Sequence, residues 1–266
     1  MPFYSIIIPT YNSAKTIKRC LQSVISQNWT NYEIIIQDGG SIDATEEIVQ
    51  EFNDDRIVFH SKKDLGVYDA MNKALERING EWVLFLGSDD TIYSDDVLEN
   101  VFFYISNTKM KFIYGDVIMK ENILDGKGIK YRGDTSDSCL LQCNICHQAI
   151  FYHESIFSRF KYNIEYMVYA DFDLNLKIAA EYERLYIPII ISNFQLGGIS
   201  SVQNDPKFET DKWNNIVDYF SNKLKDQNFR IYKNEIKKVA FKKLETGLIK
   251  EFFNVIKVYF VLKFKL

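Results

Sequence analysis

Short apolar runs alternate with amphipathic stretches through the first third of the chain. Runs at residues 4–8, 33–37, 57–60 and 82–86 are too short for helices and end on glycine, proline or polar residues, as buried strands do. The stretches between them repeat their apolar residues at helical spacing, for example Val67, Ala70, Met71, Ala74, Leu75 and Ile78. This alternation predicts a mostly parallel sheet with helices on both faces.

The alternation ends after a helix expected to finish near Asn107. A strand is predicted at residues 112–118, then a hairpin turn at Asp125-Gly126 within a mobile polar stretch at 120–145 that lies near an acceptor. Residues 146–152 are predicted to form another strand.

A helix is expected to begin near Asp171, and a strand at residues 185–192 carries Pro188, which favours an edge or a bulge. From Asp211 onward the pattern is helical, with breaks near Gln227 and Gly247. We therefore expect a main α/β domain at residues 1–206 and a helical extension at 207–266.

Charge separates these two parts. Residues 1–206 hold 18 Lys and Arg against 29 Asp and Glu, whereas 207–266 hold 14 against 7. The acidic body argues against nucleic acid as a ligand, and the basic, aromatic extension suits an anionic membrane surface. Lysines interrupt residues 248–266, so no apolar run approaches the roughly 20 residues that span a bilayer. A helix packed on the main domain, or on a second copy in a homodimer, explains this stretch equally well.

The start of the chain and its cysteines bear on location. Met1-Pro2-Phe3-Tyr4 runs into a predicted strand without a basic leader, so we expect a cytoplasmic protein. The sequence holds 4 cysteines, which we expect to be free thiols. Cys139, Cys143 and Cys146 have the C-x₃-C-x₂-C spacing of radical enzymes with an iron–sulfur cluster. Because they follow four βα units instead of the first strand of a barrel, small apolar thiols in a loop are the favoured interpretation.

The polar corner Ser88-Asp89-Asp90 follows the fourth predicted strand. Ligands of open α/β sheets gather beyond the carboxyl ends of the strands, and paired carboxylates there suit Mg²⁺ or Mn²⁺ carrying a phosphate. Taken alone, these aspartates are explained as well by a turn that caps the next helix. Neither G-x-G-x-x-G nor G-x-x-x-x-G-K-[ST] occurs, which disfavours NAD and P-loop chemistry.

Several blocks stand in the order found in family 2 glycosyltransferases. They are SIIIPTYN at 5–12, QDGGSID at 37–43, DLGVYDAMNK at 64–73 and Ser-Asp-Asp at 88–90. The third block, with CHQA at 146–149 and ADFDL at 170–174, resembles the bacterial surface-polysaccharide branch of this family. The resemblance covers roughly residues 3–203. It implies a GT-A fold, a Rossmann-like, mostly parallel mixed sheet flanked by helices, and inverting transfer of a sugar from a nucleoside diphosphate.

The resemblance also implies residue roles and partners. By position, the nucleotide site would use Pro9, Tyr11, Asn12, Asp38, Ser88 and Asp89. Asp90, with Asp89, would bind Mg²⁺ or Mn²⁺ in a DxD-type motif, and Asp171 would be the catalytic base. The expected donor is a UDP-sugar in a hexosyl transfer, and the expected acceptor is a glycan or polyprenyl-linked glycan reached from the inner membrane face.

Further residues are expected around the donor and acceptor. Gly66, Asp69 and Asn72 fall on one helix face, and His147-Gln148 lies near the diphosphate or the acceptor in relatives. The alternatives are a solvated stripe for Asp69 and Asn72, a hydrogen-bonded core residue for His147, and a capping charge for Asp171. Asp173, two residues further on, is interpreted as structural, on a solvated face.

Two departures from the family pattern leave an alternative open. Gly87 stands where many relatives have asparagine, and Ala170 stands where many have glutamate before the catalytic aspartate. Without that glutamate, no carboxylate pair raises the pKa of the base. A non-catalytic scaffold that binds a sugar nucleotide would tolerate both changes.

Overall fold

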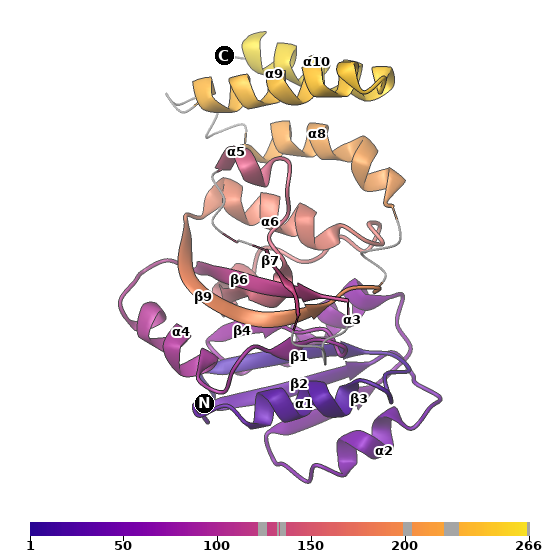
Figure 1. Ribbon diagram of the computed structural model, residues 1–266, viewed down its shortest axis with the longest axis vertical. Helices are drawn as coiled ribbons and strands as arrows, with labels where there is room; N and C mark the ends of the chain where they lie inside the picture. The colour runs from indigo at the N-terminus through magenta and orange to yellow at the C-terminus, as the bar shows by residue number, and fades with distance from the viewer. Residues whose placement is uncertain (122–126, 132, 134–136, 199–203, 221–228, 265–266) are drawn as a thin grey trace.

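The computed structural model describes residues 1–121, 127–131, 133, 137–198, 204–220 and 229–264. One sheet of 9 strands forms the centre of the molecule, with helices on both faces (Figure 1). The strands are β1 (Tyr4–Thr10), β2 (Tyr32–Asp38), β3 (Ile57–Ser61), β4 (Trp82–Phe85), β5 (Thr91–Ile92), β6 (Phe112–Lys120), β7 (Ile129–Tyr131), β8 (Ile150–His153) and β9 (Arg184–Gln195). This mixed α/β architecture confirms the predicted fold class.

The helices cover the sheet and extend beyond one end of it. They are α1 (Ile17–Ile25), α2 (Thr45–Gln50), α3 (Val67–Ala74), α4 (Val97–Ser106), α5 (Asp137–Leu140), α6 (Ala170–Glu181), α8 (Pro206–Phe220), α9 (Phe229–Glu245) and α10 (Ile249–Phe264). Two 3₁₀ turns, η2 (His147–Ala149) and η3 (Glu154–Ile156), flank β8. Among the described parts of the chain, no helix is both long and apolar enough to cross a bilayer.

The strand order is β3-β2-β1-β4-β8-β6-β9-β5, with β7 added to β6. The four predicted N-terminal strands pair in parallel, as expected, while β8 joins β4 and β6 antiparallel. All seven residues of β1 are buried, and their side chains alternate between two cores. Ile7 packs with α3 and α6 on one face, whereas Ile6 and Ile8 pack with α1 and α4 on the other. A strand buried on both faces needs apolar residues at nearly every position, which explains the continuous apolar run in the sequence.

Strand β9 carries the bulge that Pro188 predicted. The register with β6 shifts between the pair Tyr114–Tyr186 and the pair Asp116–Ile190, so β9 has extra residues around Pro188. Gly115 faces this bulge, and a Cβ there would collide with the carbonyl oxygen of Ile189. The long strand then bends across the sheet (Figure 1) and carries Gln195 to the end of β4.

Two sequence predictions about element bounds are wrong. Residues 146–149 are not strand, because η2 turns the chain there and β8 begins only at Ile150. The helix expected from Asp211 begins at Pro206, since the buried Asp205 accepts a hydrogen bond from the Phe208 amide in the first turn. The same carboxylate accepts hydrogen bonds from the amides of Val168 and Tyr169, just before α6. The expected break near Gly247 is present, with φ +75° there. The predicted turn at 125–126 and break at Gln227 lie outside the described residues.

The extension packs closely on the main domain. Apolar residues of α8, including Phe208, Ile216 and Phe220, share one hydrophobic cluster with α6. Asp173 on α6 is completely buried in this contact, so its predicted solvated face is wrong. It accepts hydrogen bonds from Asn215 (3.1 Å) and Tyr219 (2.8 Å) of α8 and pairs with Lys177 at 2.6 Å. Its structural role is thus to hold α8, and a domain boundary at 206 stays a prediction.

Candidate active site

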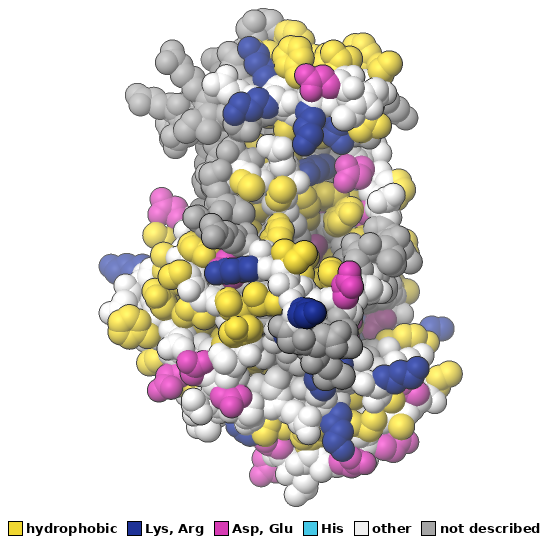
Figure 2. Space-filling view, viewed as in Figure 1, with side chains coloured by type: hydrophobic (Ala, Val, Ile, Leu, Met, Phe, Trp, Pro, Cys, Tyr) yellow, Lys and Arg dark blue, Asp and Glu magenta, His cyan; other side chains and the backbone are white. Residues whose placement is uncertain are grey.

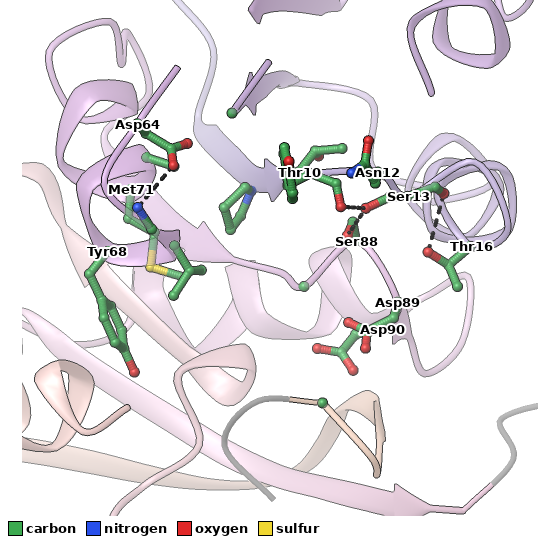
Figure 3. Close-up of a pocket in the computed structure, with 18 of the residues that line it drawn as sticks. Thr10, Asn12, Ser13, Thr16, Asp64, Tyr68, Met71, Ser88, Asp89 and Asp90 are labelled. Carbon is green, nitrogen blue, oxygen red and sulfur yellow. Dashed lines mark hydrogen bonds between the residues drawn. The ribbon is translucent and has the colours of Figure 1, made fainter. Parts of the chain in front are cut away.

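A cavity of about 740 Å³ opens at the carboxyl ends of the parallel strands. The loop after β1, the N-terminus of α3, the corner after β4, turn η2 and the end of β9 all line it. Figure 3 shows Asn12 and Ser13 on one side, Tyr68 and Met71 on α3, and Asp89 and Asp90 after β4. This is the edge at which an open α/β sheet binds its ligands.

The loop after β1 supplies the predicted residues Pro9, Tyr11 and Asn12 to the cavity wall. Asn12 has a φ of +48°, and its side chain accepts a hydrogen bond from Ile42 N at 3.0 Å, which ties the loop to that after β2. Tyr11 is 62% exposed, so its ring is available to stack on a flat ligand. The predicted Ser88 also lies in the wall, 2.8 Å from Ser13 between the two hydroxyl oxygens (Figure 3).

Asp38 at the end of β2 is buried, and residues of its own neighbourhood occupy its oxygens. Oδ2 accepts hydrogen bonds from the amides of Gly40 and Ser41, each at 2.9 Å, and from the Ser61 hydroxyl at 2.7 Å. Oδ1 accepts one from the Ser41 hydroxyl. In this arrangement Asp38 shapes the loop beneath the cavity, and its contact with a nucleotide base stays a prediction.

The corner after β4 brings two carboxylates together. Asp90 is buried, with Oδ2 accepting from Gln148 Nε2 at 2.9 Å and Oδ1 accepting from the Gln195 amide at 2.8 Å. Burial, and then the negative charge of Asp89, raise the pKa of Asp90 to about 7. Burial also raises the pKa of Asp89. Arg19 fixes this corner by donating to the Asp89 carbonyl at 2.7 Å.

The geometry of this corner explains why glycine stands at position 87. A Cβ at this position would stand 2.5 Å from Oδ2 of Asp90 and 2.9 Å from Oδ1 of Asp89. Many relatives have asparagine here, and the glycine of this chain lets the two carboxylates fold back over the backbone of residue 87.

On the side of α6, turn η2 and the first turns of two helices meet. His147 Nδ1 lies 3.1 Å from Asp171 Oδ2, and the Tyr68 hydroxyl lies 3.3 Å from Oδ1 of the same carboxylate. Oδ1 also accepts from the Phe172 amide at 2.7 Å. His147 is therefore not a plain core histidine, because it joins the predicted base. Gln148 bonds Asp90, so two consecutive residues link both acidic centres.

The residues predicted on α3 separate into two groups. Gly66 lines the cavity at a φ of +123°. Asp69 instead accepts from the Leu65 amide and pairs with Lys73 at 2.8 Å, and Asn72 exchanges two hydrogen bonds with the backbone of Tyr162. Neither belongs to the cavity wall, so they are braces for α3 in this structure.

Sequence reasoning missed several residues of the site. Gln195 and Tyr68 were not predicted, and neither were Arg19 or the cavity lysines Lys15 and Lys63. The backbone amide of Gln195 reaches Asp90 from 105 residues away, which no local pattern signals. The lysines, by contrast, stand next to predicted motif blocks, and the need to bind a diphosphate would have pointed to them.

Cys139, Cys143 and Cys146 of the C-x₃-C-x₂-C run are free thiols. Among the described residues, no group of three or more His, Cys, Asp or Glu side chains is placed to hold a metal ion. Burial, followed by the charges of Asp171 and Asp90, raises the pKa of Cys146 to about 12. Cys139 and Cys146 are half-buried and Cys143 is exposed, and the interpretation of these residues as small thiols in a loop stays a prediction.

Known protein sequences resemble this chain over most of its length. Residues 5–170 match the model of glycosyl transferase family 2. The chain is 36% identical over 216 residues to a PGL/p-HBAD biosynthesis glycosyltransferase of Mycobacterium tuberculosis, covering 78% of this chain and 82% of the relative. It is 28% identical over 224 residues to UDP-Glc:alpha-D-GlcNAc-diphosphoundecaprenol beta-1,3-glucosyltransferase WfgD of Escherichia coli, covering 83% and 87%.

Solved structures share the fold. S. aureus TarS in complex with UDP-GlcNAc superposes with a TM-score of 0.64 at 19% identity, covering 99% of this chain and 92% of that one. A mannosyltransferase from Pyrobaculum calidifontis, in complex with GDP-Man and Mn²⁺, gives 0.60 at 15% identity, covering 99% and 88%. The cavity at the strand ends and these matches define a sugar-transferring enzyme of GT-A architecture. The chain belongs to glycosyltransferase family 2, as its motif blocks predicted.

Proposed function

We propose that this glycosyltransferase moves a hexosyl group from a UDP-sugar to a hydroxyl of a glycan or lipid-linked acceptor, with inversion. The observation that carries this proposal is that Asp89, Asp90 and His147 line one cavity, with Asp171 bonded to His147. Asp89 and Asp90 stand after β4, and the His147–Asp171 pair stands opposite on η2 and α6. Turn η2 spaces them by bonding Asp171 through His147 and Asp90 through Gln148.

Asp90 and Asp89 fit a divalent cation. Mg²⁺ and Mn²⁺ are bound through one or two carboxylates, and the remaining ligands are phosphate oxygens and water. Burial raises the pKa of both carboxyls, and the charge of Asp89 raises that of Asp90 further, so a bound cation would stabilise the ionised pair. When bound, the cation neutralises the departing diphosphate. The chain's own contribution is to hold the two carboxylates in place with Gln148, Gln195 and Arg19.

Asp171, at the start of α6, is the proposed proton acceptor. Inversion needs one base, which takes the proton of the acceptor hydroxyl while its oxygen attacks the anomeric carbon opposite the diphosphate. Asp171 stands in the first turn of α6, and its Oδ2 lies 3.1 Å from Nδ1 of His147. Ala170 leaves it without an acidic neighbour in the chain, and His147 occupies the space beside it.

The choice of donor and acceptor rests on relatives. TarS structures contain UDP and UDP-GlcNAc, and the name of WfgD gives UDP-Glc as donor and a diphosphoundecaprenol-linked GlcNAc as acceptor. These names and the α9–α10 hairpin support our proposal of a lipid-linked acceptor and a role in surface polysaccharide synthesis for this chain.

The α9–α10 hairpin supports contact with the inner face of an anionic membrane. It exposes an apolar surface formed by Phe241, Leu244, Leu248, Ile249 and Phe253. Lys238, Lys242 and Lys257 are exposed on the same two helices, and Figure 2 shows yellow and blue side chains together at this end of the molecule. Apolar side chains flanked by lysines are the composition of an interfacial helix on anionic lipid.

Vesicle sedimentation tests this contact. We expect binding to phosphatidylglycerol vesicles that weakens with salt and falls at least tenfold in Ile249→Ser/Phe253→Ser. Phe103 on α4 is 67% exposed elsewhere, so Phe103→Ser is the matched control and should bind as wild type. Unchanged binding of the double variant defeats the membrane contact. A wild-type dimer in solution that the double variant abolishes assigns the surface to a homodimer instead.

Release of UDP tests the reaction. We expect wild type to release UDP from UDP-glucose or UDP-GlcNAc only with Mn²⁺ or Mg²⁺ present. Asp90→Asn and Asp171→Asn should each lower this rate by at least about 100-fold, because each removes a charge on which the reaction depends. The exposed Asp55→Asn is the control and should match wild type. UDP binding without metal-dependent turnover would instead indicate the non-catalytic scaffold.

A further inference from the structure

We propose that Asp205 is a positioning residue for the carboxylate of Asp171 and that it acts through the backbone just before α6. This inference rests on the proposed role of Asp171 as the proton acceptor. Asp205 stands directly before α8 and is 3% exposed, so its carboxylate is buried at the contact between the main domain and the extension. A buried carboxylate needs hydrogen-bond donors, and those of Asp205 come from two different helices.

The peptide bond between Val168 and Tyr169 is held at both of its polar atoms. The Tyr68 hydroxyl donates to the Val168 carbonyl at 2.5 Å, and the Tyr169 amide donates to Asp205 Oδ2 at 3.3 Å. The Val168 amide donates to the same Oδ2 at 2.9 Å. Hydrogen bonds from α3 on one side and from the start of α8 on the other therefore fix this segment.

The segment leads directly into the helix that carries Asp171. Helix α6 begins at Ala170, and the Tyr169 carbonyl already accepts a helical hydrogen bond from the Asp173 amide at 3.0 Å. The Val168–Tyr169 peptide is thus continuous with the first turn of α6. A displacement of this peptide moves the first turn and, with it, the carboxylate of Asp171.

Tyr68 connects the same segment to the carboxylate itself. Its hydroxyl lies 3.3 Å from Asp171 Oδ1, and its ring stacks on that of Tyr162 with the centroids 5.3 Å apart. Tyr68 and Val168 both line the cavity, and Figure 3 shows Tyr68 across the cavity from Asn12. The bonds from Tyr68 and Asp205 therefore act at the wall beside Asp171, away from the loop proposed to hold the nucleotide.

Helix capping explains only one oxygen of Asp205. Oδ1 accepts from the Phe208 amide at 3.2 Å, as the side chain of an N-cap residue does. Oδ2 instead faces Val168 and Tyr169, which belong to the approach to α6. The two oxygens can be tested separately, because different substitutions keep one acceptor and lose the other.

Two substitutions of Asp205 separate positioning from capping. Asp205→Ser keeps a good N-cap hydroxyl for α8, but this single, shorter group cannot also reach Val168 and Tyr169. Asp205→Asn keeps one acceptor oxygen, which should face these two amides because only one donor, the Phe208 amide, competes for it. Serine should therefore release the approach to α6, whereas asparagine should hold it.

Steady-state release of UDP measures the effect, with UDP-glucose and UDP-GlcNAc as donors, Mn²⁺ as cation and water as acceptor. Asp205→Ser should lower kcat at least about 10-fold, because a misplacement of about 1 Å costs up to about 100-fold. Its donor KM and its Kd for UDP should stay within about threefold of wild type, since the nucleotide loop is untouched. Asp205→Asn should recover kcat to within about threefold of wild type.

Tyr219→Phe is the matched control at the contact between α6 and α8. It removes the 2.8 Å hydrogen bond from α8 to Asp173 and leaves the Val168–Tyr169 peptide untouched. Its kcat should stay within about threefold of wild type, because loosening this contact does not by itself move the start of α6. Circular dichroism at the assay temperature confirms that each variant is folded.

Four results would overturn the inference. They are a kcat of Asp205→Ser within about threefold of wild type, an equal loss of kcat and of UDP binding in that variant, an Asp205→Asn as slow as Asp205→Ser, and a Tyr219→Phe as slow as either. Failure of the proposed function looks different. In that case the wild type releases no UDP with Mn²⁺, or Asp171→Asn is as active as the wild type.

Discussion

The substitution Asp90→Asn has opposite consequences for stability and for catalysis. Burial and the charge of Asp89 raise the pKa of Asp90 to about 7 in the folded protein, against an ordinary value of 3.8. The folded state thus holds a proton that the unfolded chain releases at lower pH. The stability that Asp90 contributes is complete below about pH 4 and is lost as the pH rises through about 7. A difference of about three pKa units corresponds to roughly 4 kcal/mol.

Asparagine at position 90 carries no charge and is about the size of aspartate. It therefore avoids the loss of stability on ionisation without opening a cavity. Its Oδ1 accepts the Gln195 amide as the carboxylate does, and the Gln148 amide turns over to accept from Nδ2. In metal-free buffer we expect Asp90→Asn to exceed wild type in free energy of unfolding by roughly 2–4 kcal/mol at about pH 8, and to match it near pH 4. Mn²⁺ should stabilise wild type and leave the variant unchanged.

Urea unfolding followed by circular dichroism measures both quantities. Asp55→Asn, at an exposed position, is the control and should follow wild type at each pH. A variant equal to or less stable than metal-free wild type at about pH 8 would refute the reasoning, since the buried charge would then cost nothing.

Three further substitutions test separate parts of the structure. Gly87→Ala places a Cβ 2.5 Å from Oδ2 of Asp90, so Mn²⁺-dependent UDP release should fall by about 100-fold, and an unchanged rate would contradict the folded corner. Asp173→Ala leaves Lys177 without its partner and should lower the urea-derived free energy of unfolding by about 3 kcal/mol, whereas a neutral change would remove Asp173 as an anchor of α8. Tyr68→Phe loses the hydrogen bond to the Val168 carbonyl and should lower the urea-derived free energy of unfolding by about 1 kcal/mol, whereas an unchanged value would mean that this bond does not stabilise the fold.

The parallel half of the sheet could be predicted because its strands are buried on both faces. Such strands give continuous apolar runs, and each ends in a turn whose residue types are restricted. The antiparallel half is less regular in sequence. Turn η2 was predicted as strand because Ile150, Phe151 and Tyr152 continue its apolar character, while the turn itself depends on long-range bonds from His147 and Gln148.

Among the site residues, too, some positions could be predicted from the sequence and others depend on the fold. Asn12, Ser88 and Asp90, in motif blocks that follow β1 and β4, line the cavity, whereas Asp38 at the end of β2 is not one of the described residues that line it. Asp69 and Asn72 share a motif block with Gly66 but lie on the sides of α3 that contact Lys73 and Tyr162. Motif membership does not report which way a helical side chain points.

Proton NMR of the sugar released from UDP-glucose tests the central claim most directly. The donor is an α-glycoside, so attack from the face opposite the diphosphate yields β-glucose before mutarotation mixes the anomers. With Mn²⁺ we expect β-glucose as the first product from wild type, and no early product from Asp90→Asn. If UDP-glucose is not hydrolysed, the same measurement on UDP-GlcNAc should give the β-anomer. Formation of the α-anomer first, or release that does not depend on a divalent cation, would contradict the account.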